Sequence, residues 1–215
     1  MAKRAWPKIK YGQRRGVTAE EHDKIVASER MPDYSLFFQL LWETGGSQSD
    51  VAHLNAEDVN WTTHRLHYSR RKLANKGVGQ ASLVVGARLE AVLKQLPSSG
   101  PLFPRLRLLS EDERASHFRK VCLRVEISGV TLHSYRYGWA ERACSAGMPE
   151  REAQAHLGHS SQAVHRAYAK RAEVVTLPLE HYEAIKERKL LVFCPVEETS
   201  SSIAGIDECP LAQSS

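Results

Sequence analysis

The chain has 215 residues, of which 42% are hydrophobic, and its formal net charge is +5. This length fits a single domain with tails, and no apolar run approaches the ~20 residues that span a bilayer. The basic N-terminus lacks the apolar stretch of a signal peptide, so we expect a cytoplasmic protein.

The four cysteines, Cys122, Cys144, Cys194 and Cys209, stand far apart and form no C-x-x-C pair. This spacing argues against a zinc site or a disulfide framework and predicts reduced thiols. Most of the ten histidines also lack metal-ligand spacing. We therefore expect neither a metal nor a cofactor.

The basic residues lie away from the C-terminus. Residues 190–215 contain four acids and no Lys or Arg, so all 30 bases lie in the other 189 residues, beside 21 acids. Residues 1–15 hold six bases and no acid: Lys3, Arg4, Lys8, Lys10, Arg14 and Arg15. A basic body with a basic arm is typical of a protein that binds a polyanion, which favours nucleic acid as the partner.

Composition divides the chain into three parts. Residues 1–16 read as a basic arm or linker, residues 17–189 as one folded domain, and residues 190–215 as a Ser-rich tail with an apolar patch at 190–193. Within the folded part, apolar spacing predicts helices that start after Thr18 and lie near 34–44, 47–54, 87–96, 111–125, 133–146 and 149–157, followed by one that contains Tyr168. The expected caps are Thr18, Ser49 and Thr131 at helix starts, and Gly45, Gly147 and Gly158 at helix ends.

The period of the pattern changes after Asp58. Val59–Trp61, Leu66–Arg70 and Ser82–Val85 are short runs rich in residues that favour strands, and turn-forming residues separate them. They predict a small antiparallel sheet of three strands. The fold class is therefore α+β and mostly helical.

Three motifs follow one another in the last third of the chain. T-L-H-S-Y-R contains His133 and Arg136, L-G-H-S-S contains His159, and Tyr168 stands nine residues after His159. His133 and Arg136 are three apart at a helix start, so both should project from one face. Gly158 ends a helix, which places His159 in a loop.

This series resembles the tyrosine recombinase (phage integrase) family, whose catalytic domains carry H-x-x-R, then L-G-H, then a nucleophilic tyrosine. The segment E-T-G-G-S-Q-S-D-V-A-H-L at 43–54 resembles the family's T-G-x-R-x-S-E-L box, and the predicted hairpin has a lysine near its turn. The resemblance covers about residues 14–185. It implies that residues 17–189 adopt the family's catalytic fold.

The resemblance implies a site-specific DNA recombinase or integrase that needs no metal and no ATP. Tyr168 would attack a phosphodiester to form a 3′-phosphotyrosyl link. Arg136 and His159 would bind the phosphate, and His133 would act as the base. Lys72, near the end of the second strand, would protonate the leaving 5′-oxygen and is preferred to Lys76, deeper in the loop.

The same resemblance implies double-stranded DNA as the partner, a nucleoid-associated location and a homotetramer on DNA. Residues 190–193 would dock on a neighbouring subunit or belong to a frayed tail. Full-length relatives carry an N-terminal helical domain that clamps the duplex. The chain therefore reads as an isolated catalytic domain, either cut from a longer protein or naturally short.

One position departs from the family pattern: Ser47 stands where the T-G-x-R box has its first phosphate-binding arginine. Either a neighbouring cation replaces it (Arg65, Arg70 or Arg71), or the site is slow, or the protein is a defective relative. We favour a divergent, active enzyme.

Three other functions compete with this one. They are a DNA-binding relative without strand transfer, a type IB topoisomerase, which shares the chemistry, and a helix-turn-helix regulator with its motif at residues 149–170. The last does not explain the H-x-x-R motif and its distance to Tyr168.

Overall fold

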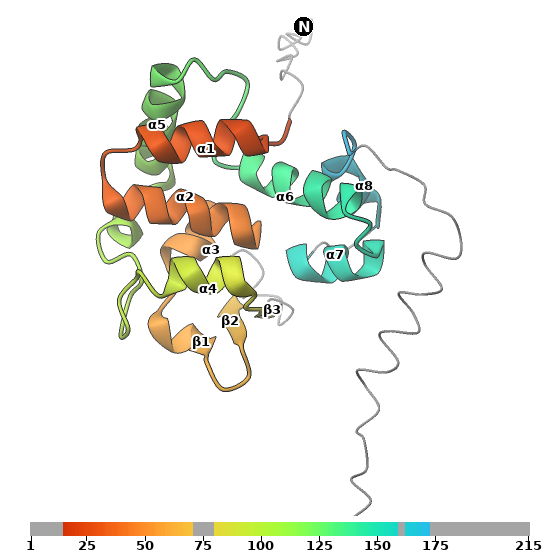
Figure 1. The fold of residues 1–215 in the computed structure, drawn as a ribbon, viewed down its shortest axis with the longest axis horizontal. Helices are drawn as coiled ribbons and strands as arrows, with labels where there is room; N and C mark the ends of the chain where they lie inside the picture. The colour runs from red at the N-terminus through yellow and green to blue at the C-terminus, as the bar shows by residue number, and fades with distance from the viewer. Residues whose placement is uncertain (1–14, 71–79, 159–161, 173–215) are drawn as a thin grey trace, which may run out of the picture. The chain divides into compact units, whose positions relative to one another are not determined.

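The computed structural model describes residues 15–70, 80–158 and 162–172. The described helices are α1 (Ala19–Ser28), α2 (Pro32–Thr44), α3 (Gln48–Ala52), α4 (Ala87–Leu93), α5 (Glu111–Arg124), α6 (Ser134–Ser145), α7 (Glu150–Leu157) and α8 (Gln162–Tyr168), with short 3₁₀ turns η1 (Ala56–Asp58) and η3 (Leu106–Leu108). The strands are β1 (Val59–Asn60), β2 (Arg65–Ser69) and β3 (Gln80–Val84). The predicted fold class, α+β and mostly helical, is confirmed (Figure 1).

The sheet has the predicted three strands, in the order β1-β2-β3, and both pairings are antiparallel. Leu66 of β2 lies opposite Leu83 of β3, and both side chains are fully buried. The neighbouring Val84 is exposed, because successive side chains of a strand point to opposite faces. One face of the sheet therefore packs on the core and the other does not.

Helix α2 lies at the centre of the domain and packs against α1, α3, α4 and α6 (Figure 1). Its run of large apolar residues predicted a buried helix, and the structure confirms this: Phe37, Phe38, Leu40 and Leu41 are fully buried. The helix ends at Gly45, whose φ of 59° is in the left-handed region that glycine adopts without a steric cost. The chain can therefore leave α2 in a sharp turn and enter α3.

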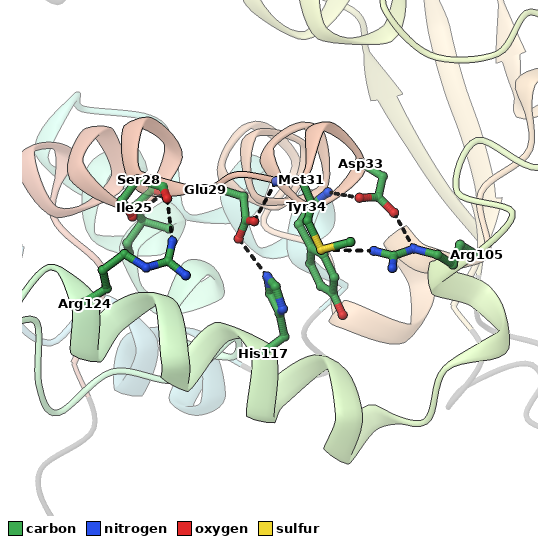
Figure 2. A network of polar contacts seen from close by, with 9 residues as sticks. All are labelled: Ile25, Ser28, Glu29, Met31, Asp33, Tyr34, Arg105, His117 and Arg124. Carbon is green, nitrogen blue, oxygen red and sulfur yellow. Dashed lines mark hydrogen bonds and ion pairs between the residues drawn. The ribbon is translucent and has the colours of Figure 1, made fainter.

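A network of polar contacts joins the connection between α1 and α2 to α5 and to the segment before η3 (Figure 2). Arg124 donates to the carbonyl of Ser28 at 2.5 Å, and His117 donates to the carboxylate of Glu29 at 2.7 Å. Arg105 pairs with Asp33 at 2.9 Å. The first two contacts fix α5 against the end of α1, and the third joins the segment before η3 to α2.

Of the three caps predicted at helix starts, two are wrong and one is confirmed, whereas Gly45 and Gly158 end α2 and α7 as predicted. Thr18 caps α1 in a reciprocal capping box with Glu21. The cap of α3, however, is Ser47 rather than Ser49: the Ser47 hydroxyl accepts a hydrogen bond from the backbone N–H of Asp50 at 3.1 Å. Thr131 does not cap α6 either. The backbone N–H of Thr131 donates to the hydroxyl of Ser134, so the side chain that makes this bond belongs to the first residue of α6 and not to Thr131.

Helices α6, α7 and α8 pack against one another and enclose a second, smaller apolar cluster. Its buried members are Trp139, Ala140, Ala143, Ala153 and Leu157, and Tyr168 packs against them. The small alanines let the three helices approach closely. This group carries most of the predicted site residues.

Several predictions concern residues outside the described part of the chain. These are the arm up to residue 14, the tail at 190–215 with its apolar patch, Cys194 and Cys209. Arg15, at the end of the arm, is described and pairs with Glu21 at 2.6 Å. Among the described helices, none has the length and apolar character to cross a membrane.

Candidate active site

His133, Arg136 and Tyr168, which the sequence predicted to share a site, lie together in the structure. His133 directly precedes α6, Arg136 lies in its first turn, and Tyr168 is the last residue of α8. The His133 Nε2 atom and the Tyr168 hydroxyl oxygen are 2.9 Å apart, within hydrogen-bonding distance. The Arg136 Cζ atom lies 5.8 Å from the centre of the Tyr168 ring. The H-x-x-R spacing thus brings both side chains to one tyrosine.

A further aromatic residue, Tyr137, supports the Tyr168 ring. The two rings are stacked, with centroids 4.3 Å apart and planes 25° apart. Tyr137 also meets the His133 ring edge-to-face at 5.5 Å. Sequence reasoning missed this residue, although Tyr137 stands four positions after His133, a spacing that places both on one helix face.

Arg136 is held from two sides by backbone carbonyls. Its Nη1 donates to the carbonyl of Gly45 at 3.0 Å, and its Nη2 donates to the carbonyl of Leu157. Burial lowers the pKa of Arg136, and the phenol of Tyr168 acts in the opposite direction. The guanidinium is therefore a partly desolvated cation in a fixed orientation, and such a group stabilises negative charge better than a solvated one.

The end of α2 connects this group of residues to the rest of the domain. The last four carbonyls of a helix have no partner within the helix. Here four consecutive carbonyls each accept a hydrogen bond from a side chain of α6 or α7: Trp42 from Arg142, Glu43 from the Trp139 indole, Thr44 from His156 and Gly45 from Arg136. The end of α2 thus positions α6 and α7.

Burial lowers the pKa of two of these donors, His156 and Arg142. His156 stacks on Trp139 at 3.9 Å and donates to the carbonyl of Thr44 at 2.9 Å. Burial lowers its pKa to about 4, and the positive charges of Arg70 and Arg136 act in the same direction. Arg142 lies 3.5 Å above the Trp42 ring, and burial lowers its pKa to about 10. His156 is therefore neutral, and Arg142 charged, at neutral pH.

The similarity of the chain to known proteins agrees with its fold. The model of the phage integrase family matches residues 17–174. The chain belongs to the phage integrase family. No curated protein matches it.

Solved structures of integrases share its fold. Lambda integrase, solved as a dimer bound to a core site, superposes with a TM-score of 0.63 at 19% identity, over 78% of this chain and 52% of that one. The catalytic domain of bacteriophage HP1 integrase has a TM-score of 0.59 at 20% identity, over 83% of this chain and 97% of that one.

The integrase of transposon Tn1549, solved with transposon right-end DNA, has a TM-score of 0.61 at 12% identity, over 85% of this chain and 68% of that one. This chain spans about half the length of the lambda integrase chain that it matches. At these identities the likeness establishes the fold.

Ser47, which the sequence resemblance places at the arginine of the T-G-x-R box, is the N-terminal cap of α3 in the structure. Of the three cations that the sequence offered as replacements, Arg65 is exposed and donates to Ser82 at 3.1 Å. Arg70 is 9% exposed and donates to carbonyls of α7. Arg71 lies outside the described residues.

Three other predicted site residues, Lys72, Lys76 and His159, also lie outside the described residues. The described part of the chain contains no group of three or more His, Cys, Asp and Glu side chains that could hold a metal ion. Its two cysteines, Cys122 and Cys144, are free thiols, as the sequence predicted.

Proposed function

We propose that this phage integrase family member is a site-specific DNA recombinase that cuts and rejoins strands through a covalent bond to Tyr168. The observation that carries the proposal is the distance of 2.9 Å between the Tyr168 hydroxyl and His133 Nε2. A phenol has an ordinary pKa of about 10, so an imidazole at this distance is well placed to take its proton during attack.

The proposed reaction proceeds in two balanced steps. The Tyr168 oxygen attacks the phosphorus, its proton passes to His133, and the bond from phosphorus to the 5′-oxygen breaks. The leaving 5′-oxygen takes a proton from Lys72 and becomes a hydroxyl. In the second step the 5′-hydroxyl of another strand attacks the 3′-phosphotyrosyl bond and releases Tyr168, with the protons moving in reverse. The phosphotyrosyl bond conserves the energy of the broken linkage.

Arg136 would stabilise the charge that develops on the non-bridging oxygens, with His159 as a further donor. A guanidinium carries five N–H donors in a rigid fork, and Arg136 uses Nη1 and Nη2 to hold two carbonyls. The fork is thereby oriented before substrate binds. Preorganised donors of this kind each contribute about 10²–10³ in rate.

The proposed substrate is double-stranded DNA. The formal net charge of +5 and the DNA in the lambda and Tn1549 integrase structures support this. A homotetramer on two duplexes is proposed on the same family grounds, with residues 17–189 as the catalytic domain. DNA affinity should fall steeply with salt, because binding releases counterions from the phosphates.

A competing function is a DNA-binding relative without strand transfer, and the observation that favours it is Ser47, which acts as a helix cap instead of supplying an arginine. Nicked suicide duplexes separate the two functions. A pool of end-labelled duplexes with a randomised core carries a nick close to the scissile phosphate, so that the short 5′-hydroxyl fragment diffuses away after cleavage.

Under the proposal, the wild-type protein yields a labelled covalent band in denaturing gels, and Tyr168→Phe yields none. If a gel shift shows DNA binding but no covalent band forms at any pH, the non-catalytic function replaces the proposed one. A band that persists in Tyr168→Phe would also overturn the assignment. Relaxation of supercoiled plasmid without a preferred sequence would identify a type IB topoisomerase instead.

A further inference from the structure

Arg70, the residue that follows β2, is a charged side chain in a buried position. It is 9% exposed, and its Nη2 donates to the carbonyl of His156 at 2.7 Å and to that of Ala155 at 3.3 Å. Both carbonyls belong to the last turn of α7, where the helix dipole places partial negative charge. The positive charge of Arg70, which follows β2, is thus fixed at the end of α7, about 85 residues further along the chain.

Gly158 makes this position possible. A Cβ atom at residue 158 would lie 1.9 Å from Arg70 Nη1 and 2.2 Å from its Cζ. Such contacts are far shorter than any van der Waals distance, so the guanidinium lies directly on the backbone at the end of α7. Gly158 also has a φ of 65°, in the region that favours glycine. The glycine of the L-G-H motif therefore has two roles: it adopts the left-handed turn, and it leaves room for the side chain of Arg70.

Arg136 reaches the same turn of α7. Its Nη2 donates to the carbonyl of Leu157, one residue after the carbonyls that hold Arg70. Burial is the main cause that lowers the pKa of Arg136, and the charge of Arg70 contributes. Asp50 is an acid whose charge also acts on Arg136. Two guanidinium groups therefore contact the same turn of α7, and their positive charges favour the binding of an anion.

We propose that Arg70 supplies a second guanidinium that binds the scissile phosphate beside Arg136. This inference rests on the proposed function. The bonds to α7 use Nη2, and Arg70 also has a side-chain hydrogen bond with Tyr68. A guanidinium carries five N–H donors on Nε, Nη1 and Nη2, so these contacts do not use all of them. Paired guanidinium groups suit a phosphodiester, because each non-bridging oxygen can accept a charge-assisted hydrogen bond. Arg70 thereby replaces the cation that Ser47 does not provide.

The alternative is that Arg70 only ties α7 to the sheet. The two roles differ in how they depend on the charge of the substrate. A donor that stabilises a phosphate anion loses its value when the anion is made neutral, whereas a structural contact matters equally for every substrate. A methylphosphonate linkage, in which a methyl group replaces one non-bridging oxygen, makes the scissile position neutral.

The experiment measures cleavage rates on a duplex recovered from the randomised pool, made with either a phosphate or a methylphosphonate at the scissile position. Arg70→Ala should cleave the phosphate about 100-fold more slowly and the methylphosphonate at close to the wild-type rate. Arg70→Lys keeps the charge but loses the fork, so its cleavage rate on the phosphate should lie between those of Arg70→Ala and the wild-type protein.

The matched control is Arg105→Ala, which removes an arginine whose contacts are with Asp33, Met31 and Tyr34 (Figure 2). It should leave both rates unchanged. Thermal unfolding is measured for each variant, and if Arg70→Ala does not fold, the ratio of the two rates in Arg70→Lys decides.

Two outcomes would overturn the inference while the proposed function stands. An equal loss on both substrates would make Arg70 a structural residue, and no loss on either would remove it from the site. In both cases the wild-type band that depends on Tyr168 remains. If the wild-type protein forms no such band, the proposed function fails, and this inference fails with it.

Discussion

The ring of Tyr137 stacks on the ring of Tyr168 with their centroids 4.3 Å apart, while the Tyr168 hydroxyl lies 2.9 Å from His133. The contact holds one face of the proposed nucleophile and leaves its hydroxyl directed at the imidazole. It comes from the α6 turn that also carries Arg136. A short stretch of one helix therefore supplies the proposed base, a cation and an aromatic support.

We expect Tyr137→Ala to slow formation of the covalent adduct by about 2- to 10-fold, because an aromatic pair contributes about 0.5–1.5 kcal/mol beyond its buried area. Tyr137→Phe keeps the ring and should retain the wild-type rate. Single-turnover cleavage of the recovered duplex provides the measurement. If the Ala and Phe variants are slowed equally, the Tyr137 hydroxyl rather than the ring is responsible.

Gly158 offers a test of the Arg70 position through stability alone. Gly158→Ala must accept a left-handed backbone and displace the guanidinium, whereas Gly147→Ala faces only the first cost, since Gly147 has a φ of 75° and nothing within 4 Å of an added Cβ. We expect a loss of about 1–2 kcal/mol for Gly147→Ala and about 2–5 kcal/mol for Gly158→Ala. Urea unfolding measures both. Equal losses would mean that Arg70 moves aside at no cost.

Much of the fold follows from local patterns in the sequence. The buried helix α2 was predicted because its apolar residues are continuous and a glycine pair ends it, and α2 was found at Pro32–Thr44. The strands were found within two residues of their predicted bounds. His133 and Arg136 were predicted to share a helix face, and both meet Tyr168. In each case the sequence pattern that allowed the prediction spans only a few residues.

What the sequence did not reveal depends on contacts between distant segments. Nothing near Arg70 in the sequence indicates that its partners are carbonyls of α7. The four side chains that donate hydrogen bonds to the end of α2 also come from distant residues, in α6 and α7. The cap of α3 was misplaced for a local reason: Ser47 and Ser49 both precede helix-forming residues, and the turn at Gly45 decides which one the helix follows.

Ser47 should contribute to stability as a helix cap. Its hydroxyl accepts from the Asp50 N–H at 3.1 Å, so Ser47→Ala leaves that donor without a side-chain partner and should lower the free energy of unfolding by about 1 kcal/mol. Ser47→Asp retains an acceptor and should stay near the wild-type value. Chemical denaturation of the three proteins tests this, and an unchanged Ser47→Ala protein would refute the role.

Acid should destabilise the domain well above the pH at which carboxylates titrate. His22 is buried against Trp42 and Tyr135, and burial lowers its pKa to about 4, with the charge of Asp23 opposing this shift and that of Arg142 adding to it. Above pH ~6.5 His22 is neutral whether the chain is folded or not. Below that pH His22 becomes protonated in the unfolded chain, whereas in the folded domain it stays neutral down to about pH 4. Stability therefore falls as pH falls through this window.

The loss from His22 should reach about 2 kcal/mol between pH 7.5 and pH 5. His156, also with a pKa of about 4, and His165, whose pKa burial lowers, should add to it. His22→Phe keeps a ring on Trp42 and removes the titrating group, so its free energy of unfolding should fall less steeply over this range. The control is His67→Gln, an exposed position on β2, which should follow the wild-type curve. If His22→Phe follows that curve as well, His22 is not the group responsible.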